Sequence, residues 1–192
     1  MENLEKYLKY YFLEDYLFNE VHENFKYRNY LKPEEFLAIV IWKSNRAKTK
    51  FKIKSRGELN AEKIKIATKE LYSLAKNCEK NEEKMLGVIT ELSGIGIPTA
   101  SAILTVCYPN YFTIIDYRAK ESLMKYLKEY DYKKIFGADP RNSKKAYLKY
   151  CKLCRDEVKK LKITLRNFDR MLFGIDFYDG KNGLADLAKE LS

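Results

Sequence analysis

The sequence contains no glutamine and, among 192 residues, a single histidine, His22. One histidine with scattered serines and aspartates gives no support for a Ser-His-Asp hydrolase. The missing glutamine goes with abundant lysine, glutamate, tyrosine and isoleucine. This bias is typical of thermophilic proteins, although a genome of low GC content would produce it too.

Long hydrophobic runs are also missing. Residues 36–42 form one of the longest, at seven residues, whereas a membrane-spanning helix needs about 20. Residues 1–6 have neither the basic region nor the apolar region of a signal peptide. We therefore expect a cytoplasmic protein without a membrane partner, and no obligate protein partner is evident.

Cysteines are few, and their spacing is unfavourable for a metal centre. Of the four, only Cys151 and Cys154 lie close together. A structural zinc site needs four ligands, and an iron–sulfur cluster needs four closely spaced cysteines. We expect buried, reduced thiols, no metal held by side chains and no required cofactor.

Positive charge is concentrated in one segment. The chain has 37 Lys+Arg against 27 Asp+Glu, a net charge of +10. Residues 43–69 hold ten positive and two negative residues, ten minus two giving +8. Such a cluster is suited to nucleic-acid phosphates, or it is the solvated face of a lysine-rich protein. The candidate phosphate contacts are Lys43, Arg46, Lys48, Lys50, Lys52 and Lys54.

The pattern of apolar residues favours an all-α fold in one domain or two small lobes. Residues 39–41 are β-branched and also fit a buried strand. Otherwise the strand-like pieces are residues 48–54 and 113–115. Helical spacing predicts helices near residues 4–24, 33–43, 60–78, 85–92, 98–107, 116–127, 139–161, 164–172 and 183–191.

Residues 92–104 contain the most informative pattern. Two amphipathic segments are joined by Gly94-Ile95-Gly96, and Pro98 suits the first turn of the second helix. The small residues 99–102 permit two helices to cross closely. Backbone N–H groups at such a turn bind phosphate. An ordinary αα-turn can contain Gly-x-Gly, but it does not require the proline and the small residues that follow in this order.

This stretch resembles the helix-hairpin-helix of the DNA glycosylase superfamily, which includes endonuclease III, MutY and the 8-oxoguanine glycosylases. The family's downstream aspartate has a counterpart in Asp116, at the end of residues 108–116 and 22 residues after Gly94. The resemblance implies an all-α, two-lobed fold without an iron–sulfur cluster. Residues 33–115 would form the hairpin lobe, residues 1–32 and 116–192 the other, with the active cleft between them.

The resemblance also implies roles for particular residues. Asp116 would be the catalytic carboxylate, although as a helix cap it would bond the N–H of Arg118 or Ala119 in any fold. A monovalent cation would bind the carbonyls of Leu92, Gly94 and Ile97. The residues that would bind DNA through the hairpin backbone are Gly94, Ile95, Gly96, Ile97 and Thr99.

One departure from the family decides the expected chemistry. Bifunctional relatives carry a lysine nucleophile where this sequence has Pro98, so we expect a monofunctional glycosylase that uses water. Trp42, Lys43 and Tyr117 are the candidates for the pocket of a damaged base flipped from duplex DNA. The alternatives are a non-enzymatic DNA- or RNA-binding module and an abasic-site lyase with a relocated Lys43 or Lys120.

Overall fold

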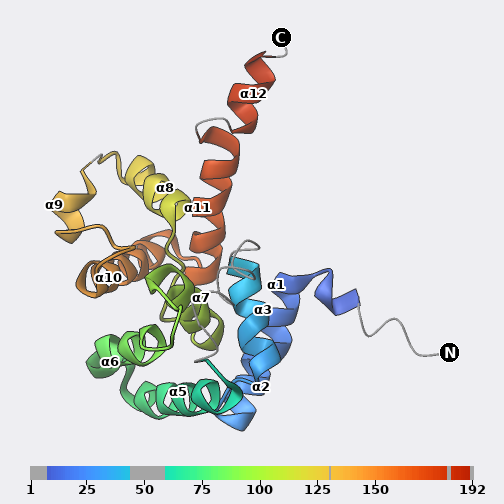
Figure 1. Cartoon of the computed structure of the whole chain (residues 1–192). Helices are drawn as coiled ribbons and strands as arrows, with labels where there is room; N and C mark the ends of the chain where they lie inside the picture. Colours follow the sequence, from blue (N-terminus) through green and yellow to red (C-terminus); the bar gives the residue numbers. More distant parts are fainter. Residues whose placement is uncertain (1–7, 44–58, 130, 181–182, 191–192) are drawn as a thin grey trace. The chain divides into compact units, whose positions relative to one another are not determined.

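The computed structural model describes residues 8–43, 59–129, 131–180 and 183–190 of the chain (Figure 1). Within these ranges most residues are helical and none is in a strand. The all-α prediction is confirmed. Residues 113–115 belong to neither a helix nor a strand, and residues 48–54 lie outside the described ranges.

The chain divides into two compact units, Met1–Tyr108 and Pro109–Ser192. The hairpin belongs to the first unit and Asp116 to the second. These bounds differ from the lobes expected from the resemblance, 33–115 and 1–32 with 116–192. The N-terminal helices pack against α3 and α7 of the first unit. The cleft between two lobes stays a prediction.

The first unit begins with one continuous helical stretch. It comprises α1 (Leu13–Asp15), the π-helical η2 (Tyr16–Val21) and α2 (His22–Arg28). It ends at Asn29, whose φ of 68° is left-handed, a conformation that asparagine tolerates. The stretch therefore lies further along the chain than the predicted residues 4–24. Leu17, Val21 and Phe25 of this stretch are completely buried.

The third helix, α3 (Pro33–Lys43), begins where a proline at the first position predicts it. The Glu35 carboxylate accepts the N–H of Lys32 at 2.9 Å, so the side chain reaches back to the start of its own helix. Residues 39–41 are helical, and the strand interpretation of them is wrong. Buried Phe36, Ile39 and Val40 line the side of α3 that faces the core.

The other described helices of the first unit are α5 (Ala61–Leu74), η3 (Ala75–Asn77), α6 (Cys78–Thr90) and α7 (Ile97–Cys107). Asn60 caps α5 by accepting the N–H of Lys63 at 2.9 Å, at the start of the predicted helix 60–78. Every residue of α7 from Ala100 to Cys107 is buried, and this helix packs against α2, α3 and α6. The second helix of the hairpin is therefore the centre of the unit.

The second unit contains α8 (Tyr117–Leu127), α9 (Tyr132–Phe136), α10 (Lys144–Leu161), α11 (Leu165–Asp179) and α12 (Leu184–Glu190). The predicted start of α10 at residue 139 is wrong, because Ser143 caps the helix by accepting the N–H of Ala146. Asp139 instead holds Arg141 in a turn. The helix α11 is longer than expected, and α9 was not expected.

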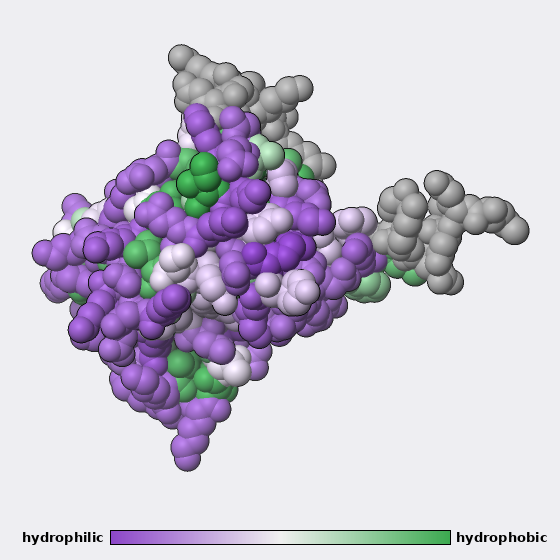
Figure 2. Space-filling view, turned by 90° about the horizontal axis from the view of Figure 1, so that it is seen from below, coloured by the Kyte–Doolittle hydropathy of each residue, from purple (hydrophilic) through white to green (hydrophobic). Residues whose placement is uncertain are grey.

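Aromatic side chains dominate the core of the second unit. The largest completely buried ones are Phe112, Phe136, Tyr147, Tyr150 and Phe168. On the face shown in Figure 2, hydrophilic side chains cover most of the surface and apolar ones form small separate patches. Among the described residues, no helix is long and apolar enough to cross a membrane.

Candidate functional site

The hairpin turn presents backbone to solvent while its side chains anchor it to the core. Gly94 and Gly96 are exposed, whereas the isoleucines at positions 95 and 97 are 5% and 8% exposed. A phosphate that approached the turn would therefore meet main-chain atoms first. Of the predicted contacts, Ile95 and Ile97 would act through their backbone.

The two glycines are needed for different reasons. Gly94 has φ of 83°, where an L-residue is strained. Gly96 has an ordinary extended φ of −93° and is the N-cap of α7 without a capping side chain. Its carbonyl accepts the N–H groups of Thr99 and Ala100 at 3.0 and 2.9 Å. Among the backbone–backbone hydrogen bonds of the described residues, none is donated by the N–H of Gly96 or Ile97, so these two groups at the start of α7 are available to a ligand.

The predicted cation site has a partial acceptor set. The Leu92 carbonyl accepts the N–H of Ile95 at 3.0 Å, which leaves it one further lone pair. No group of three or more histidine, cysteine or acidic side chains among the described residues is arranged to hold a metal. A monovalent cation bound through the carbonyls of Leu92, Gly94 and Ile97 stays a prediction.

Asp116 begins α8 in the second unit. Its Oδ1 accepts the N–H of Ala119 at 2.8 Å, and its carbonyl accepts the N–H of Lys120 at 3.2 Å. The capping prediction is thus confirmed, with Ala119 as the donor. The side chain is half-buried. A carboxylate here lies at the positive end of the helix dipole.

The segment before Asp116 is held by side chains of α10, which the sequence did not indicate. Residues 112–115 are buried, and buried carbonyls need donors. The hydroxyls of Tyr147 and Tyr150 donate to the carbonyls of Thr113 and Ile114, both at 3.0 Å. Arg155 donates to the carbonyl of Tyr111 at 2.9 Å. Three residues of one helix therefore fix the backbone that leads into Asp116.

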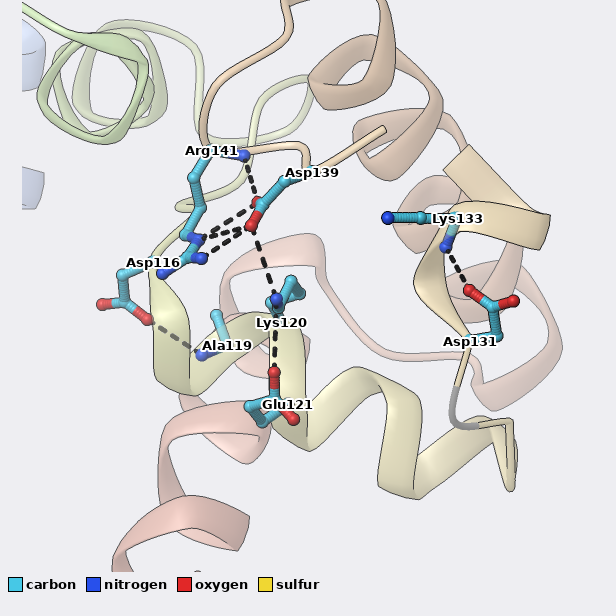
Figure 3. A network of polar contacts seen from close by, with 8 residues as sticks. All are labelled: Asp116, Ala119, Lys120, Glu121, Asp131, Lys133, Asp139 and Arg141. Carbon is cyan, nitrogen blue, oxygen red and sulfur yellow. Dashed lines mark hydrogen bonds and ion pairs between the residues drawn. The ribbon is translucent and has the colours of Figure 1, made fainter. Parts of the chain in front are cut away.

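A buried lysine lies one helical turn after Asp116 (Figure 3). Lys120 is 3% exposed. Its Nζ lies 3.3 Å from a Glu121 carboxylate oxygen, 3.5 Å from one of Asp139, and 3.9 Å from the centre of the Tyr132 ring. Two carboxylates and an aromatic face thus surround this ammonium group, which is how a buried charge is tolerated.

Asp139 connects the lysine to an arginine. The Arg141 side chain donates to both oxygens of Asp139, with Nη2 at 2.6 Å and Nε at 3.0 Å. The backbone N–H of Arg141 donates to the same carboxylate at 2.9 Å. Chiefly because of these hydrogen bonds from Arg141, the pKa of Asp139 falls to about 2. Lys120, Asp139 and Arg141 therefore form one charged network beside the N-terminal turn of α8.

Tyr117, a predicted pocket residue, has an exposed ring beside this network. It is 59% exposed. The Arg141 guanidinium lies 5.5 Å and the Lys120 Nζ 5.8 Å from the ring centre. An exposed aromatic ring that is held by cations is suited to stacking against a base.

The other predicted pocket residues belong to the first unit. Trp42 and Lys43 are the last two residues of α3, both half-buried. The Trp42 ring meets that of Phe18 edge-on, with centroids 5.6 Å apart. That these residues share a pocket with Asp116 and Tyr117 stays a prediction.

Part of the predicted phosphate-binding segment lies on α5. Lys65 and Lys69, both in the basic segment, are one turn apart. Their Nζ atoms lie 5.5 and 5.6 Å from the Tyr30 ring centre, and the Arg28 guanidinium lies 5.7 Å from it. Within the described ranges, neither lysine forms an ion pair. Arg46, Lys48, Lys50, Lys52 and Lys54 lie outside the described residues.

His22 and the closely spaced Cys151 and Cys154 are part of the helix packing. His22 Nδ1 lies 2.8 Å from the Val106 carbonyl, to which it donates when protonated there, near the end of α7. Cys151 and Cys154 are free, completely buried thiols on α10. Burial raises the pKa of Cys154 well above its ordinary value, so its reactive thiolate is disfavoured.

The missed residues are those that tertiary structure brings together. Asp139, Arg141, Tyr147, Tyr150 and Arg155 come from a turn and a helix that share no local motif with Asp116. The sequence did contain one signal of this charged network, because Lys120 lies beside the apolar face of the predicted helix 116–127. A lysine at such a position indicates a buried or partnered charge.

Comparisons with known proteins identify no relative of this chain. Neither a family model, nor a curated protein, nor a solved structure matches it. The function is therefore argued from the geometry of the hairpin and of the Asp116 site.

Proposed function

We propose that the protein is a monofunctional DNA N-glycosylase, which hydrolyses the glycosidic bond of a damaged base flipped out of duplex DNA. The observation that carries this proposal is a half-buried aspartate at a helix N-terminus, 22 residues after an exposed glycine turn with N–H groups available to a phosphate. This order of elements is that of helix-hairpin-helix glycosylases.

The hairpin would anchor the DNA backbone. Exposed Gly94 and Gly96 let a phosphate reach the N-terminal N–H groups of α7, and the helix dipole favours an anion there. Such contacts carry no base specificity. They would hold the duplex in register while the damaged base leaves the stack.

Asp116 would supply the chemistry. As the bond between C1′ and the base nitrogen breaks, the base departs with the bonding pair and positive charge develops on the sugar. A nearby carboxylate stabilises that charge more strongly in the transition state than in the ground state. Asp116 would also orient a water molecule and take its proton as the water oxygen bonds to C1′. The departing base would be protonated from solvent.

Exposed Tyr117 supports the same assignment, because its ring directly follows Asp116 in the chain and lies beside Arg141. A flipped base needs a stacking partner outside the duplex. The ring is a candidate for that partner.

A lyase that uses Lys120 is disfavoured by the environment of this residue, whereas Lys43, the other candidate lysine, is half-buried at the end of α3. A lysine nucleophile needs an unprotonated amine that reaches the sugar. Lys120 is 3% exposed, with its ammonium held by Glu121 and Asp139. We therefore expect Lys120 to form no covalent DNA adduct when the protein is incubated with abasic DNA and borohydride. A trapped adduct that Lys120→Ala abolishes would favour the lyase instead.

The decisive experiment is an excision assay on duplexes that each carry one damaged base. Asp116→Asn is the informative variant, because asparagine caps helices about as well as aspartate but lacks the charge. We expect excision to fall by about 100-fold or more. Asp131→Asn is the matched control, since Asp131 caps α9 in the same unit by accepting the N–H of Lys133. It should leave excision unchanged.

Two outcomes contradict the proposal. Full excision by Asp116→Asn would show that another group performs the chemistry. Tight binding to duplex DNA without excision of any base in a broad panel would instead favour a non-enzymatic binding module.

A further inference from the structure

Residues 132–155 form a second basic segment, which lies in the second unit. They contain eight Lys+Arg and one acidic residue, eight minus one giving +7. Acidic residues elsewhere in the chain offset this excess in the net charge of +10. On α10 three of these lysines are exposed, and spacings of four and three residues place them on one side of the helix. We call them the lysine ridge: Lys145, Lys149 and Lys152.

The lysine ridge lies on the side of α10 opposite the core. The buried side of this helix carries Tyr147, Tyr150 and Cys154. Between Lys145 and Lys152 the helix rises about 10 Å, which is the axial length of about three phosphates on one strand of duplex DNA. The ridge is therefore a straight row of charge, which fits an extended polyanion better than a single small anion.

Acidic side chains of the second unit do not neutralise the lysine ridge. Within the described ranges, no ion pair involves its three lysines. The acids on the same helix pair further along it, Asp156 with Lys159 at 3.4 Å and Glu157 with Lys160 at 2.6 Å. The acids on α9, on the turn before α10 and on α11 are also bound. Their partners are the Lys133 N–H for Asp131, Arg141 for Asp139, Arg166 for Asp169, Arg118 for Asp176 and Lys125 for Asp179.

The position of the first lysines of α10 is unfavourable for the free protein. Lys144 and Lys145 are the first two residues of the helix, and its first turn contains no acidic residue. The positive end of the helix dipole disfavours cations there. Like charges one turn apart along the ridge also repel one another. An anionic partner would relieve both effects, so this arrangement indicates a binding surface.

Other lysines of the basic segment have a local explanation. Lys133 and Lys134 stand in the last turn of α9, where the negative end of the helix dipole favours cations. Lys149 reaches the same end of α9, because its Nζ would lie 3.7 Å from a Cβ atom added at Gly137. Lys145 and Lys152 have no such explanation within the described residues, so they are the positions that test the ridge.

The lysine ridge begins close to the Asp116 site. Arg141 precedes Lys145 by four residues, which span at most about 14 Å. The Arg141 guanidinium lies 5.5 Å from the ring centre of Tyr117, the residue after Asp116. The ridge and the Asp116 site belong to the same unit, so one duplex can contact both.

We propose that the lysine ridge of α10 binds the phosphate backbone of duplex DNA, as a contact in the second unit that is separate from the hairpin. Charge complementarity points to a polyanion, and the straight row that begins near Arg141 favours a nucleic-acid strand. That this nucleic acid is duplex DNA rests on the proposed function. The ridge would supply affinity that depends on salt and not on base sequence.

Fluorescence anisotropy with an undamaged duplex, measured over a series of salt concentrations, tests the proposal. We expect Lys145→Ala/Lys152→Ala to reduce the slope of log affinity against log salt by about 2, because two phosphate contacts are lost. Lys80→Ala/Lys84→Ala is the matched control. It removes the same charge from exposed positions of α6 in the other unit, where Glu79, Glu82 and Glu83 offset the lysines. The control should keep the wild-type slope.

Lys145→Glu separates DNA binding from stability. A glutamate in the first turn of α10 is favoured by the helix dipole and removes the repulsion along the ridge. We therefore expect a urea midpoint at least as high as that of the wild type, together with weaker DNA binding than Lys145→Ala shows. A lowered midpoint would mean that the ridge stabilises the fold, and the proposal would be wrong.

Three binding results would also overturn the proposal. The first is a wild type that does not bind the duplex, or a ridge variant that keeps the wild-type slope. The second is an equal change in the ridge variant and the control, which would mean that only overall charge matters. The third is a ridge variant that loses binding to vesicles of anionic phospholipid but keeps its affinity for DNA, because the ridge would then face a membrane.

Excision is measured separately, so the two proposals can fail independently. A reduced slope in the ridge variant of a protein that excises no base would support the ridge and contradict the glycosylase. Normal excision with an unchanged slope would do the reverse.

Discussion

The ionisation of Asp139 makes the stability of the fold depend on pH. Hydrogen bonds from Arg141 lower its pKa from 3.8 to about 2. A carboxyl group that binds protons more weakly in the folded state stabilises the fold above its unfolded-state pKa. That contribution is lost as the pH falls through the folded-state value. The relevant window is therefore between about pH 4 and pH 2.

We predict that Asp139→Asn lowers the free energy of unfolding by about 2 kcal/mol at neutral pH, because the shift corresponds to that energy. The difference from the wild type should shrink steadily below pH 4. Urea unfolding at a series of pH values measures it. The exposed Asp186→Asn is the control and should give no such trend. If Asp139→Asn loses the same unfolding free energy at pH 7 and at pH 2, the charge of Asp139 does not contribute to stability.

Glu35 is the centre of a buried hydrogen-bond network in the first unit. It is 3% exposed and accepts hydrogen bonds from the side chains of Arg28 and Asn24 and from the Lys32 N–H. Removing one partner of a buried ion pair leaves the other charge unsatisfied. The network also connects the end of α2 to the start of α3.

We expect Glu35→Ala to lower the free energy of unfolding by about 3 kcal/mol. Its neighbour provides a sharp control, because the Glu34 side chain is 66% exposed and lies 4.0 Å from Lys32. Glu34→Ala should change stability by less than about 0.5 kcal/mol. Urea denaturation of both variants decides the matter, and equal losses would contradict the role assigned to the buried network.

At the scale of elements, the two glycines of the hairpin turn have different expected roles: Gly94 in the stability of the fold and Gly96 in phosphate binding. Gly94→Ala places a side chain at φ of 83°, so we expect a loss of about 1–2 kcal/mol in unfolding free energy. Gly96→Ser should not destabilise the fold, because serine is a favoured N-cap and its Cβ would only touch Pro98 at 3.9 Å. Its hydroxyl would, however, compete with phosphate for the N–H groups of α7.

Fluorescence anisotropy with duplex DNA, measured beside urea unfolding, distinguishes these effects. Gly96→Ser should weaken DNA binding several-fold while the unfolding free energy is kept. If Gly96→Ser binds as tightly as the wild type, the N-terminus of α7 is not a phosphate site.

The elements also show where sequence reasoning succeeds. Caps at Asn60, Asp116 and Thr164 were predictable, because each bonds an N–H within three residues. The start of α10 was not, because Asp139 interacts with Arg141 and Lys120 rather than with the first turn of a helix. Residues 113–115 looked like a strand because a short β-branched run does not reveal whether its carbonyls bond to a neighbouring strand or to tyrosines of α10.

At the scale of the whole molecule, the net charge of +10 predicts salt-dependent DNA binding. Lys65 and Lys69 gather at Tyr30 on the first unit, so they are candidates for two of the phosphate contacts. Lys65→Ala/Lys69→Ala should reduce the slope of log affinity against log salt by about 2. The exposed pair Lys133→Ala/Lys134→Ala, on α9 of the other unit, is the control of equal charge. An equal change in both slopes would mean that only overall charge matters.

The sequence by itself determined the all-α class, the hairpin and the capping role of Asp116, because helical periodicity, glycine conformation and caps are local properties of the chain. Tertiary structure alone decided that Tyr147, Tyr150 and Arg155 hold the segment before Asp116, and that Lys120, Asp139 and Arg141 form one network. Apart from the Asp139–Arg141 pair, which is two positions apart, these contacts join residues 19 to 44 positions apart. Buried carbonyls and a buried ammonium take whichever partners the packed helices bring to them, and no local pattern specifies that choice.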